Sequence, residues 1–496
     1  MRINFVLFLS IIIILSVWAT ISSYSYLQEI YSDFTGGKIT YIVKQLDRDL
    51  LYPDEGYVRF YGYVAYLDDH GLLKPICNIR VEIHGVRTFF DQLIEYRYTN
   101  KYGFFIIDVN KKALEEYKGV FLKFAFDSDA VHIVAEFDKV VSARMSLFVS
   151  EFNASAMSLY VPNNLSSSLT ISRGAKFVEL KSGLVVYYVL GGICKRAAPV
   201  YNYIMMAYDY IRDIMDVPPP KVKVSIDRNN LATYYDIFER VIYICGDPEH
   251  ADWLDFSVIV HEYAHFLHSS FSELPPYARE NHRWNEHTDP ITAWVEGFAD
   301  FFPSVIKDYY GMKKADRYID AYGTFWLINE SLEEFYVPIK DEDYSDVECA
   351  VAAFMWDLYD SHSDDMNSDG LVDNISMGFR LIWNVIISYD PDPSDPEHNR
   401  PWTIHEFIEG LRILYPWVDN VSLEALLREH GIRYGGFIDI NEIVRMKKAE
   451  LTKVKILHYL YNYLPRFFII ILTVMLAIKL YRKIRKRKRT YWIQDI

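Results

Sequence analysis

The segment from Asp255 to Ser269 constrains the fold more than any other part of this 496-residue chain. Apolar side chains recur in it at intervals of three and four residues, at Phe256, Ile259, Val260, Tyr263, Ala264 and Leu267. That periodicity predicts an α-helix with one buried stripe. Because one face of this helix is buried, polar residues next to that face are expected to form a functional site and not a chance pattern on the protein surface.

Two histidines and a glutamate lie beside the stripe in the pattern His-Glu-x-x-His. His261 and His265 are four residues apart, so their imidazoles share one face of the helix and can bind one Zn²⁺. Glu262 lies next to them, where its carboxylate can reach a water molecule on the metal. A catalytic zinc also needs a third protein ligand and an open position for that water.

The third ligand has two candidate sources. A metzincin would have a glycine and a third histidine where this chain has His268 and Phe271, so that source is excluded. His268 is interpreted as a packing residue or as a neighbour of a ligand. Residues 288–306 supply the other source, because Asp289 as N-cap and Pro290 as first helical residue predict a second helix there.

Glu296 and Asp300 lie one turn apart on this second predicted helix. Its other residues are mostly apolar, at Trp294, Val295, Phe298, Phe301 and Phe302, and acids inside such a helix need a partner. Glu296 would then be the third metal ligand, and Asp300 would accept a hydrogen bond from a ligating histidine. Gly297 would let the two helices approach closely. The alternative is a solvated helix face.

The motif His261-Glu262-x-x-His265, followed by Glu296-Gly297-Phe298-Ala299-Asp300, resembles the gluzincin metallopeptidases, the group of thermolysin, fungalysin and the aminopeptidases. The resemblance implies a zincin-type fold in which His261, His265 and Glu296 are the zinc ligands and Glu262 is the general base. It also implies that Asp300 contacts one of the ligands and does not bind the metal itself. The interval of 31 residues from His265 to Glu296 is longer than in thermolysin and suggests an inserted loop over 269–289. Residues 348–358 look like the helix that follows the metal site in several secreted gluzincins.

The resemblance also implies an edge strand that pairs with extended substrate, for which residues 241–245 are the candidate. It further implies a Tyr or His that stabilises the oxyanion formed during hydrolysis. Four side chains lie in suitable regions for that role, at Tyr344, Tyr389, His398 and His405, and no motif selects among them.

Residues 56–140 predict a small β-sandwich, because short aromatic and β-branched stretches are separated by Gly and Asn turns. The sequence Val81-Glu82-Ile83, followed by Thr99-x-x-x-Gly103-Phe104-Phe105, resembles the carboxypeptidase-regulatory, transthyretin-like sandwich. That resemblance implies an accessory module without chemistry of its own, and an unrelated sandwich is the alternative.

The rest of the body divides into a connector over 141–195 and a gluzincin-like domain over 196–435. Within this domain, apolar spacing predicts a helix over 199–217 and strands over 222–226 and 241–245. The expected fold class is therefore α+β, with the small sandwich preceding the metallopeptidase domain and a membrane segment at each end.

Both ends of the chain carry apolar runs. Residues 5–21 fit a signal peptide or an uncleaved signal anchor within 1–24, with a buried strand as the alternative. Residues 459–481 reach the length of a transmembrane helix. The basic run 482–489 in the tail 482–496 marks the cytoplasmic side. The alternative is an amphipathic basic tail that does not cross the membrane, but such a tail would not need the apolar block that precedes it. The body is therefore expected outside the cytoplasm, at the cell membrane.

Charge and cysteine content exclude two classes of site. The formal net charge is −15, and the last eighteen residues hold eight Lys or Arg and one acid, which leaves 44 basic and 66 acidic residues elsewhere, or −22. Nucleic-acid binding needs a basic face, so no nucleic-acid partner is expected. The four cysteines form no C-x-x-C pair, so a Cys-ligated zinc is not expected, while one or two disulfides would fit an extracellular body.

Residues 365–373 match the pattern of a calcium loop. The oxygen ligands would come from the side chains of Asp365, Asn367, Asp369 and Asp373 and from the backbone carbonyl of Leu371. Ser376 occupies the position at which an EF-hand has a bidentate Glu, which lowers the expected affinity. Extracellular Ca²⁺ is plentiful, so weak binding would suffice; the alternative is a plain polar turn.

These patterns favour a membrane-anchored, extracytoplasmic zinc peptidase that hydrolyses peptides or proteins. Zinc would activate a water molecule, and Glu262 would move its proton. The alternative is a non-catalytic zincin-fold protein with a binding or structural role at the cell surface or envelope. A scaffold without activity has no reason to keep Glu262, so the sequence favours the enzyme.

Overall fold

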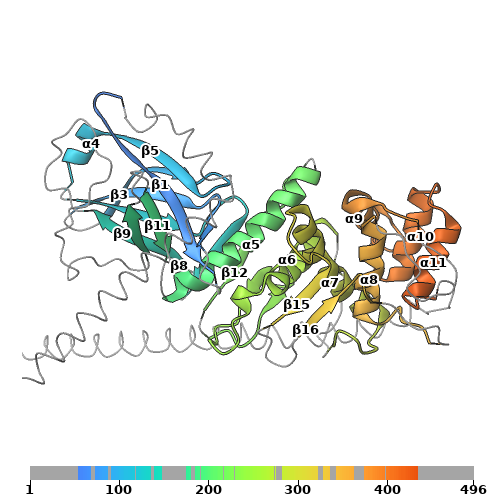
Figure 1. Ribbon diagram of the computed structural model, residues 1–496. Helices are drawn as coiled ribbons and strands as arrows, with labels where there is room; N and C mark the ends of the chain where they lie inside the picture. Colours follow the sequence, from blue (N-terminus) through green and yellow to red (C-terminus); the bar gives the residue numbers. More distant parts are fainter. Residues whose placement is uncertain are drawn as a thin grey trace, which may run out of the picture. The chain divides into compact units, whose positions relative to one another are not determined.

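The computed structural model describes residues 54–433, apart from 69–72, 88–90, 118, 136–138, 148–174, 180–184, 190–191, 216, 228, 273, 275–281, 322–327, 336–341, 362–373 and 397. Its fold is mixed α+β (Figure 1). The predicted N-terminal apolar segment, the segment 459–481, the basic tail and the calcium loop 365–373 lie outside the described residues. Among the described helices, none is long and apolar enough to cross a membrane.

The chain divides into two compact units. The first contains the described residues up to Ser272 and those of Phe298–Glu334 and Met377–Leu381, and the second contains the other described residues. The division falls between Gly297 and Phe298, inside a helix that runs without a break from Pro290 to Tyr309.

Two sheets form the N-terminal part of the first unit (Figure 1). In one, β1 (Tyr57–Leu67) pairs with β5 (Phe104–Asn110) and β2 (Leu73–Pro75) antiparallel and with β11 (Val185–Val189) parallel, and β10 (Ala175–Glu179) pairs with β11. The other has the order β4 (Asp91–Tyr98), β3 (Arg80–Val86), β6 (Val120–Ala125), β9 (Ser142–Leu147).

Alternating side chains from the two sheets form the core between them. Phe105 on β5 and Phe124 on β6 are both buried and meet edge to face, with ring centroids 6.5 Å apart. Such contacts are expected where two sheets pack face to face. A short helix, α4 (Lys111–Glu115), follows β5 and is capped by the Asn110 side chain, which accepts a hydrogen bond from the Lys112 amide.

Residues 56–140, predicted as a β-sandwich, contribute strands to three sheets. Strands β7 (Val131–Ala135) and β8 (Lys139–Val140) lie within that range but belong to a third sheet. Strands β9, β10 and β11 lie in the predicted connector 141–195 and pair with the two sandwich sheets. Alternation in the sequence identifies a strand but not its partners, because pairing depends on contacts far apart in the chain.

The third sheet has the order β13 (Tyr234–Asp236), β14 (Val241–Tyr243), β12 (Val222–Ser225), β7, β8. The predicted edge strand over 241–245 is wrong, because β14 lies between β12 and β13 in this sheet. The edge strand is β13, which pairs with β14 antiparallel. Strand β13 has only three residues, and their polarity is mixed, so the sequence shows no periodicity that would predict it.

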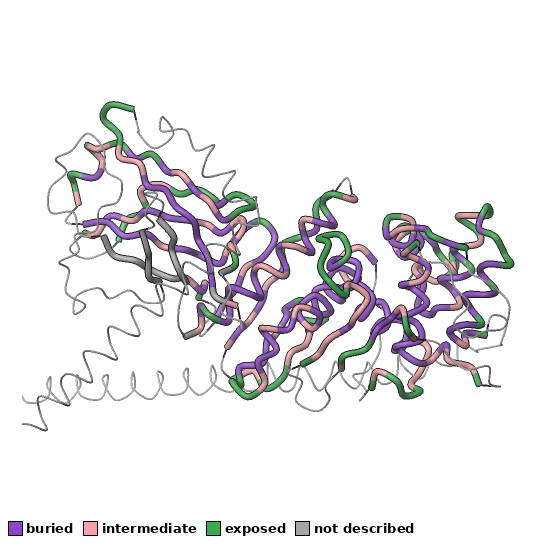
Figure 2. Tube along the Cα trace, viewed as in Figure 1, coloured by how far each residue is buried: buried purple, intermediate pink, exposed green. Residues whose placement is uncertain are grey.

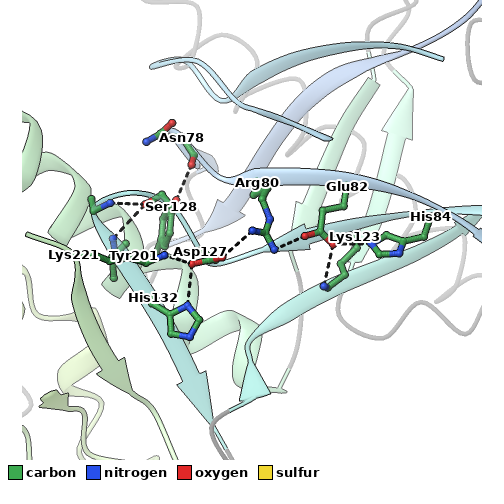
Figure 3. Close-up of polar contacts among 12 residues, drawn as sticks. Asn78, Arg80, Glu82, His84, Lys123, Asp127, Ser128, His132, Tyr201 and Lys221 are labelled. Carbon is green, nitrogen blue, oxygen red and sulfur yellow. Dashed lines mark hydrogen bonds and ion pairs between the residues drawn. The ribbon is translucent and has the colours of Figure 1, made fainter. Parts of the chain in front are cut away.

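A charged cluster joins β3 of the sandwich to the third sheet (Figure 3). Asp127 contacts Lys221 at 2.5 Å and Arg80 at 2.9 Å, and Glu82 contacts Arg80 at 2.5 Å and Lys123 at 3.0 Å. Burial alone would raise the pKa of Glu82, but hydrogen bonds from His84 and Lys123 lower it to about 2. Glu82 therefore stabilises the fold at neutral pH, and that stabilisation is lost as the pH falls from about 4.5 towards 2.

Helices carry the rest of the described chain. Helix α5 (Gly192–Ile214) begins seven residues before the predicted start, and Pro199 lies inside it. The helices and strands that follow are η1 (Asp252–Leu254), α6 (Phe256–Phe271), α7 (Pro290–Tyr309), β15 (Arg317–Asp320), β16 (Ile328–Ser331), α8 (Glu348–Tyr359), α9 (Gly378–Ser388), α10 (Ile404–Leu414) and α11 (Asn420–Glu429). All four cysteines are free thiols, so the structure contains none of the disulfides that the sequence allowed.

Candidate metal centre

Helix α6 carries the His-Glu-x-x-His motif, as predicted from its apolar stripe. Ile259, Val260, Tyr263, Ala264 and Leu267 are all fully buried, and Figure 2 shows most of the helix as buried. His261, Glu262 and His265 are each less than a tenth exposed. The burial of three polar side chains in one helix requires partners for them, and these come from helix α7, strand β13 and the histidines themselves.

The two histidines face one another. Their Nε2 atoms are 3.0 Å apart, and their rings are nearly perpendicular at 87°. Two nitrogens at about 2.05 Å from a tetrahedral zinc are separated by roughly 3.3 Å, so the observed spacing is close to that of zinc ligands. On the other side of the His261 ring, Nδ1 lies 2.8 Å from Asp300 Oδ1. A carboxylate only accepts, so His261 carries its proton on Nδ1 and directs the Nε2 lone pair towards His265.

Helix α7 brings the two predicted acids to this point. It begins at Pro290, and the Asp289 carboxylate accepts hydrogen bonds from the amides of Ile291 and Thr292, which confirms the predicted cap. Glu296 and Asp300 are 4% and 3% exposed. The alternative of a solvated helix face is therefore wrong, since both carboxylates are buried.

Three side chains converge on one point. The ligand atoms of His261, His265 and Glu296 all lie within 4.8 Å of one another. Two imidazole nitrogens and one carboxylate oxygen form the donor set of a zinc site that keeps a fourth position for water. The residues present therefore fit a zinc ion, with Asp300 placed to hold the tautomer and orientation of His261. The hydroxyl of buried Tyr318 on β15 also lies 3.4 Å from His261 Nδ1.

Glu262 points towards the edge of the third sheet. One of its carboxylate oxygens, Oε2, accepts a hydrogen bond of 2.7 Å from the backbone amide of Tyr235 on β13. The general-base candidate is thereby hydrogen-bonded to β13, an edge strand of this sheet among the described residues. The sequence places Glu262 next to His261 but gives no sign that β13 is its neighbour.

Gly297 permits a close helix approach, but to a different helix from the one expected. A Cβ atom at this position would lie 2.7 Å from Val351 Cβ and 2.9 Å from the carbonyl oxygen of Glu348, both in α8. The expectation that Gly297 brings α7 close to α6 is therefore corrected. The apolar segment 348–358 forms helix α8 as expected, and this helix packs against Gly297.

His268 lies one turn beyond His265 and is fully buried. Among the described residues, neither of its ring nitrogens has a hydrogen-bond partner. Burial, with a smaller contribution from His265, lowers the pKa of His268 to about 3, so the ring is neutral. It packs edge to face on Phe298 with ring centroids 5.4 Å apart, which agrees with the interpretation of His268 as a packing residue.

The four residues considered for oxyanion stabilisation have other surroundings. Tyr344 packs on His287, the Tyr389 ring lies over Gly410, and His398 contacts Glu406 at 2.9 Å. His405 lies on α10 and is half-buried. None of the contacts found for these four within the described chain involves His261, His265 or Glu296.

His282 is not among the residues that the sequence patterns single out. Its Nδ1 is 2.8 Å from Glu348 Oε1, and its Nε2 is 3.8 Å from Glu296 Oε1. The residue lies in the segment between α6 and α7, where the spacing suggests an inserted loop. A lone histidine in such a segment has no periodicity, and its partner Glu348 is 66 residues further along the chain, so no pattern in the sequence joins the two.

Asp252 gives a prediction about pH and stability. It is 6% exposed on η1, and its Oδ1 has no hydrogen-bond partner among the described residues. Burial raises the pKa of Asp252 to about 6, against the lowering effect of the Thr233 hydrogen bond, and Asp320 raises it further. A raised carboxyl pKa means that stability is lost as pH rises from about 4 to 6, because the folded protein retains a proton that the unfolded chain releases. We expect Asp252→Asn to stabilise the protein at pH 7.5 by at most about 3 kcal/mol and much less at pH 4.

Thermal unfolding of Asp252→Asn and wild type at both pH values measures this effect. The matched control is Glu249→Gln, since Glu249 is exposed on the segment just before η1. An equal gain in Tm at pH 4 and 7.5, or an equal gain in the control, would show that burial of the Asp252 charge is not the cause.

Comparison with known proteins agrees with this geometry for part of the chain. Residues 221–414, less than half of the chain, match the family described as the mycolysin C-terminal domain, and this range includes all of α6 and α7. No curated protein matches the chain. A 9R-lipoxygenase from Cyanothece PCC8801 aligns with 25% of this chain and 21% of its own at 16% identity, but its TM-score of 0.12 supports no inference about fold or function. The mycolysin match relates residues 221–414 to zinc metallopeptidases, and so to hydrolases that act on peptides or proteins.

Proposed function

We propose that the protein is a zinc-dependent peptidase with His261, His265 and Glu296 as metal ligands and Glu262 as general base. The observation that carries the proposal is that the ligand atoms of three buried side chains lie within 4.8 Å of one another. The hydrogen bond between His261 and Asp300 supports it, because it orients one of these ligands. When bound, zinc would polarise the scissile carbonyl and lower the pKa of water, which supplies the nucleophile at neutral pH.

The protein's own side chains supply the remaining steps. Glu262 would accept the proton of the attacking water and deliver it to the leaving amine, as a positioned acid–base group does. Asp300 would keep the His261 lone pair directed at the metal. Edge strand β13 would bind the substrate in an extended conformation beside Glu262, which accepts the hydrogen bond of the Tyr235 amide.

The second candidate is a zincin-fold protein without catalytic activity that has a binding or structural role at the cell surface or envelope. Burial of Glu262 against a backbone amide, next to the ligand cluster, favours the enzyme. A carboxylate that served only structure in this position could be replaced by glutamine, whose amide oxygen would also accept the Tyr235 hydrogen bond.

Membrane anchoring is part of the proposal and rests on the sequence alone. The apolar segments 5–21 and 459–481 and the basic run 482–489 would place the body outside the cytoplasm. Protease added to sealed cells should digest the body and leave the basic tail intact; protection of the body would contradict this topology. The calcium loop over 365–373 stays a prediction.

The proposed activity is tested on the full-length protein, purified in detergent. We expect about one zinc per chain and cleavage of a mixed-peptide substrate that is abolished by a chelator and restored by zinc. A protein that binds zinc stoichiometrically but cleaves no peptide would favour the non-catalytic alternative. A protein without zinc would contradict both.

A further inference from the structure

A buried lysine joins helices α6 and α7 to strand β15. Lys307 lies near the end of α7 and is 6% exposed. Its ammonium group donates hydrogen bonds of 2.7 Å to Ser257 Oγ on α6 and of 2.6 Å to the carbonyl oxygen of Arg317 on β15. It also lies 5.8 Å from the centre of the Phe256 ring, a position that suits a cation. A buried charge is costly unless it is paired, and the proposed reaction gives this one no role.

The lysine belongs to a set of contacts that hold β15 against the start of α6. Ser257 Oγ also accepts a hydrogen bond of 3.2 Å from the amide of Ile319 on β15. Asp255, the N-cap residue of α6, accepts one of 2.6 Å from the amide of Ala321, which directly follows the strand. Strand β15 lies beside α6 (Figure 1). Its backbone is thus held at three alternate residues, 317, 319 and 321.

Tyr318 lies in the middle of this strand and contacts a proposed metal ligand. It is 5% exposed, its hydroxyl oxygen lies 3.4 Å from His261 Nδ1, and the two ring centroids are 6.1 Å apart. His261 carries its proton on Nδ1, because the Asp300 carboxylate at 2.8 Å can only accept. The Tyr318 oxygen therefore accepts a second, longer branch of the same hydrogen bond, on the side of the ring away from Nε2.

We propose that Tyr318 is a positioning residue for His261, and that Lys307 and Ser257 act through it by holding β15 in place. This inference rests on the proposed function, because it takes His261 as a zinc ligand. The Tyr318 ring and the Asp300 carboxylate would together restrict rotation of the imidazole, so that Nε2 stays directed towards His265. Groups that orient a ligating histidine increase the affinity of the site for its metal.

The register of the strand explains how the lysine acts on the tyrosine. Ser257 lies one helical turn before His261 on α6, and Ile319 follows Tyr318 on β15. The Ser257–Ile319 hydrogen bond therefore determines which strand residue lies beside His261. A shift of β15 by one residue would turn the Tyr318 side chain to the opposite face of the strand. Burial lowers the pKa of Lys307 to about 8, so its ammonium group is still charged and donating at neutral pH.

Two buried hydroxyls near the site offer matched controls. Tyr263 on α6 is fully buried, and its hydroxyl has no hydrogen-bond partner in the described part of the chain. Ser304 on α7 is also fully buried, and its Oγ likewise has no partner among these residues. Tyr263→Phe and Ser304→Ala therefore remove the same atoms as Tyr318→Phe and Ser257→Ala without breaking a hydrogen bond to β15 or His261.

The test measures the zinc affinity of the full-length protein by competition with a chelator. We expect Tyr318→Phe to weaken zinc binding about 3- to 10-fold, the range for loss of a neutral hydrogen bond. Ser257→Ala should weaken it by at least about twofold, but by less than that in the Tyr318→Phe background, because both substitutions act through one contact. Lys307→Met should resemble Ser257→Ala in zinc affinity, with a lower Tm because more packing is lost. Tyr263→Phe and Ser304→Ala should bind zinc as wild type does.

A spectrum separates this role from a purely structural one. Cobalt(II) in the place of zinc absorbs visible light, and its spectrum depends on the geometry of the ligands. We expect a changed spectrum in Tyr318→Phe and Ser257→Ala and the wild-type spectrum in both controls. Wild-type zinc affinity and spectrum in Tyr318→Phe would overturn the proposal, whatever its Tm, and so would fully additive effects of Tyr318→Phe and Ser257→Ala. If the wild-type protein itself binds no zinc, the proposed function fails instead, so the two failures are distinguishable.

Discussion

Replacement of Glu262 by glutamine is expected to leave the zinc content unchanged and to lower kcat by at least about 100-fold, the usual scale for a positioned acid–base group. The amide has nearly the same size as the carboxylate, and its oxygen can still accept the 2.7 Å hydrogen bond from the Tyr235 amide. It cannot accept a proton from water at neutral pH. The variant thus removes the proton transfer and keeps strand β13 and the metal ligands in place.

The matched control for this experiment is Glu286→Gln. Glu286 lies in the segment before α7, its side chain is 57% exposed, and it pairs only weakly with Arg283 as a surface residue. This substitution makes the same chemical change away from the cluster and should leave kcat and zinc content at wild-type values. Metal analysis and one peptide assay per variant suffice. A Glu262→Gln protein that turns over normally would show that the base is another group.

Helices α6 and α7 could be predicted because their signals are local. The stripe of α6 has a period that only a helix produces, and Asp289-Pro290 marks the start of α7 through the capping of its first amides. The convergence of His261, His265 and Glu296 follows once the two helices are packed together, and the structure brings these three ligand atoms within 4.8 Å. Their role as zinc ligands stays a prediction.

The features that sequence reasoning missed depend on contacts between distant parts of the chain. Strand β7 has the same alternation as the sandwich strands, and only its parallel pairing with β12, about ninety residues later, assigns it to the third sheet. Strand β13 pairs antiparallel with β14. This pairing makes β13 the edge strand and places β14 inside the sheet. His282 contacts Glu348, which lies 66 residues further along the chain.

The start of helix α5 differs from the prediction for another reason. Apolar spacing predicts a helix from Pro199 to Val217, and a proline is best tolerated in the first turn of a helix. Helix α5 instead begins at Gly192, and every residue from Arg196 to Tyr201 is buried. Burial of Ala197, Ala198, Val200 and Tyr201 offsets the backbone hydrogen bond that proline cannot make, and no local signal in the sequence indicates this burial.

The largest expected effect on metal binding belongs to Glu296. Glu296→Ala removes one of three protein ligands and leaves a site with two imidazoles, so zinc and activity should be lost together. Asp300→Ala leaves all three ligands but frees Nδ1 of His261 from its 2.8 Å contact. We expect its zinc affinity to fall by roughly 10–100-fold, the usual effect of removing the partner of a ligating histidine.

Two further variants make the comparison selective. His268→Ala should keep its zinc, since the ring packs on Phe298 and lies beyond the cluster, although loss of a buried side chain will lower the Tm. Asp308→Ala removes an exposed acid near the end of α7 and should match wild type in zinc content and activity. The expected order of zinc affinity is therefore wild type, His268→Ala and Asp308→Ala together, then Asp300→Ala, then Glu296→Ala. If His268→Ala loses zinc while Glu296→Ala retains it, the third ligand comes from α6 itself and the assignment of Glu296 is wrong.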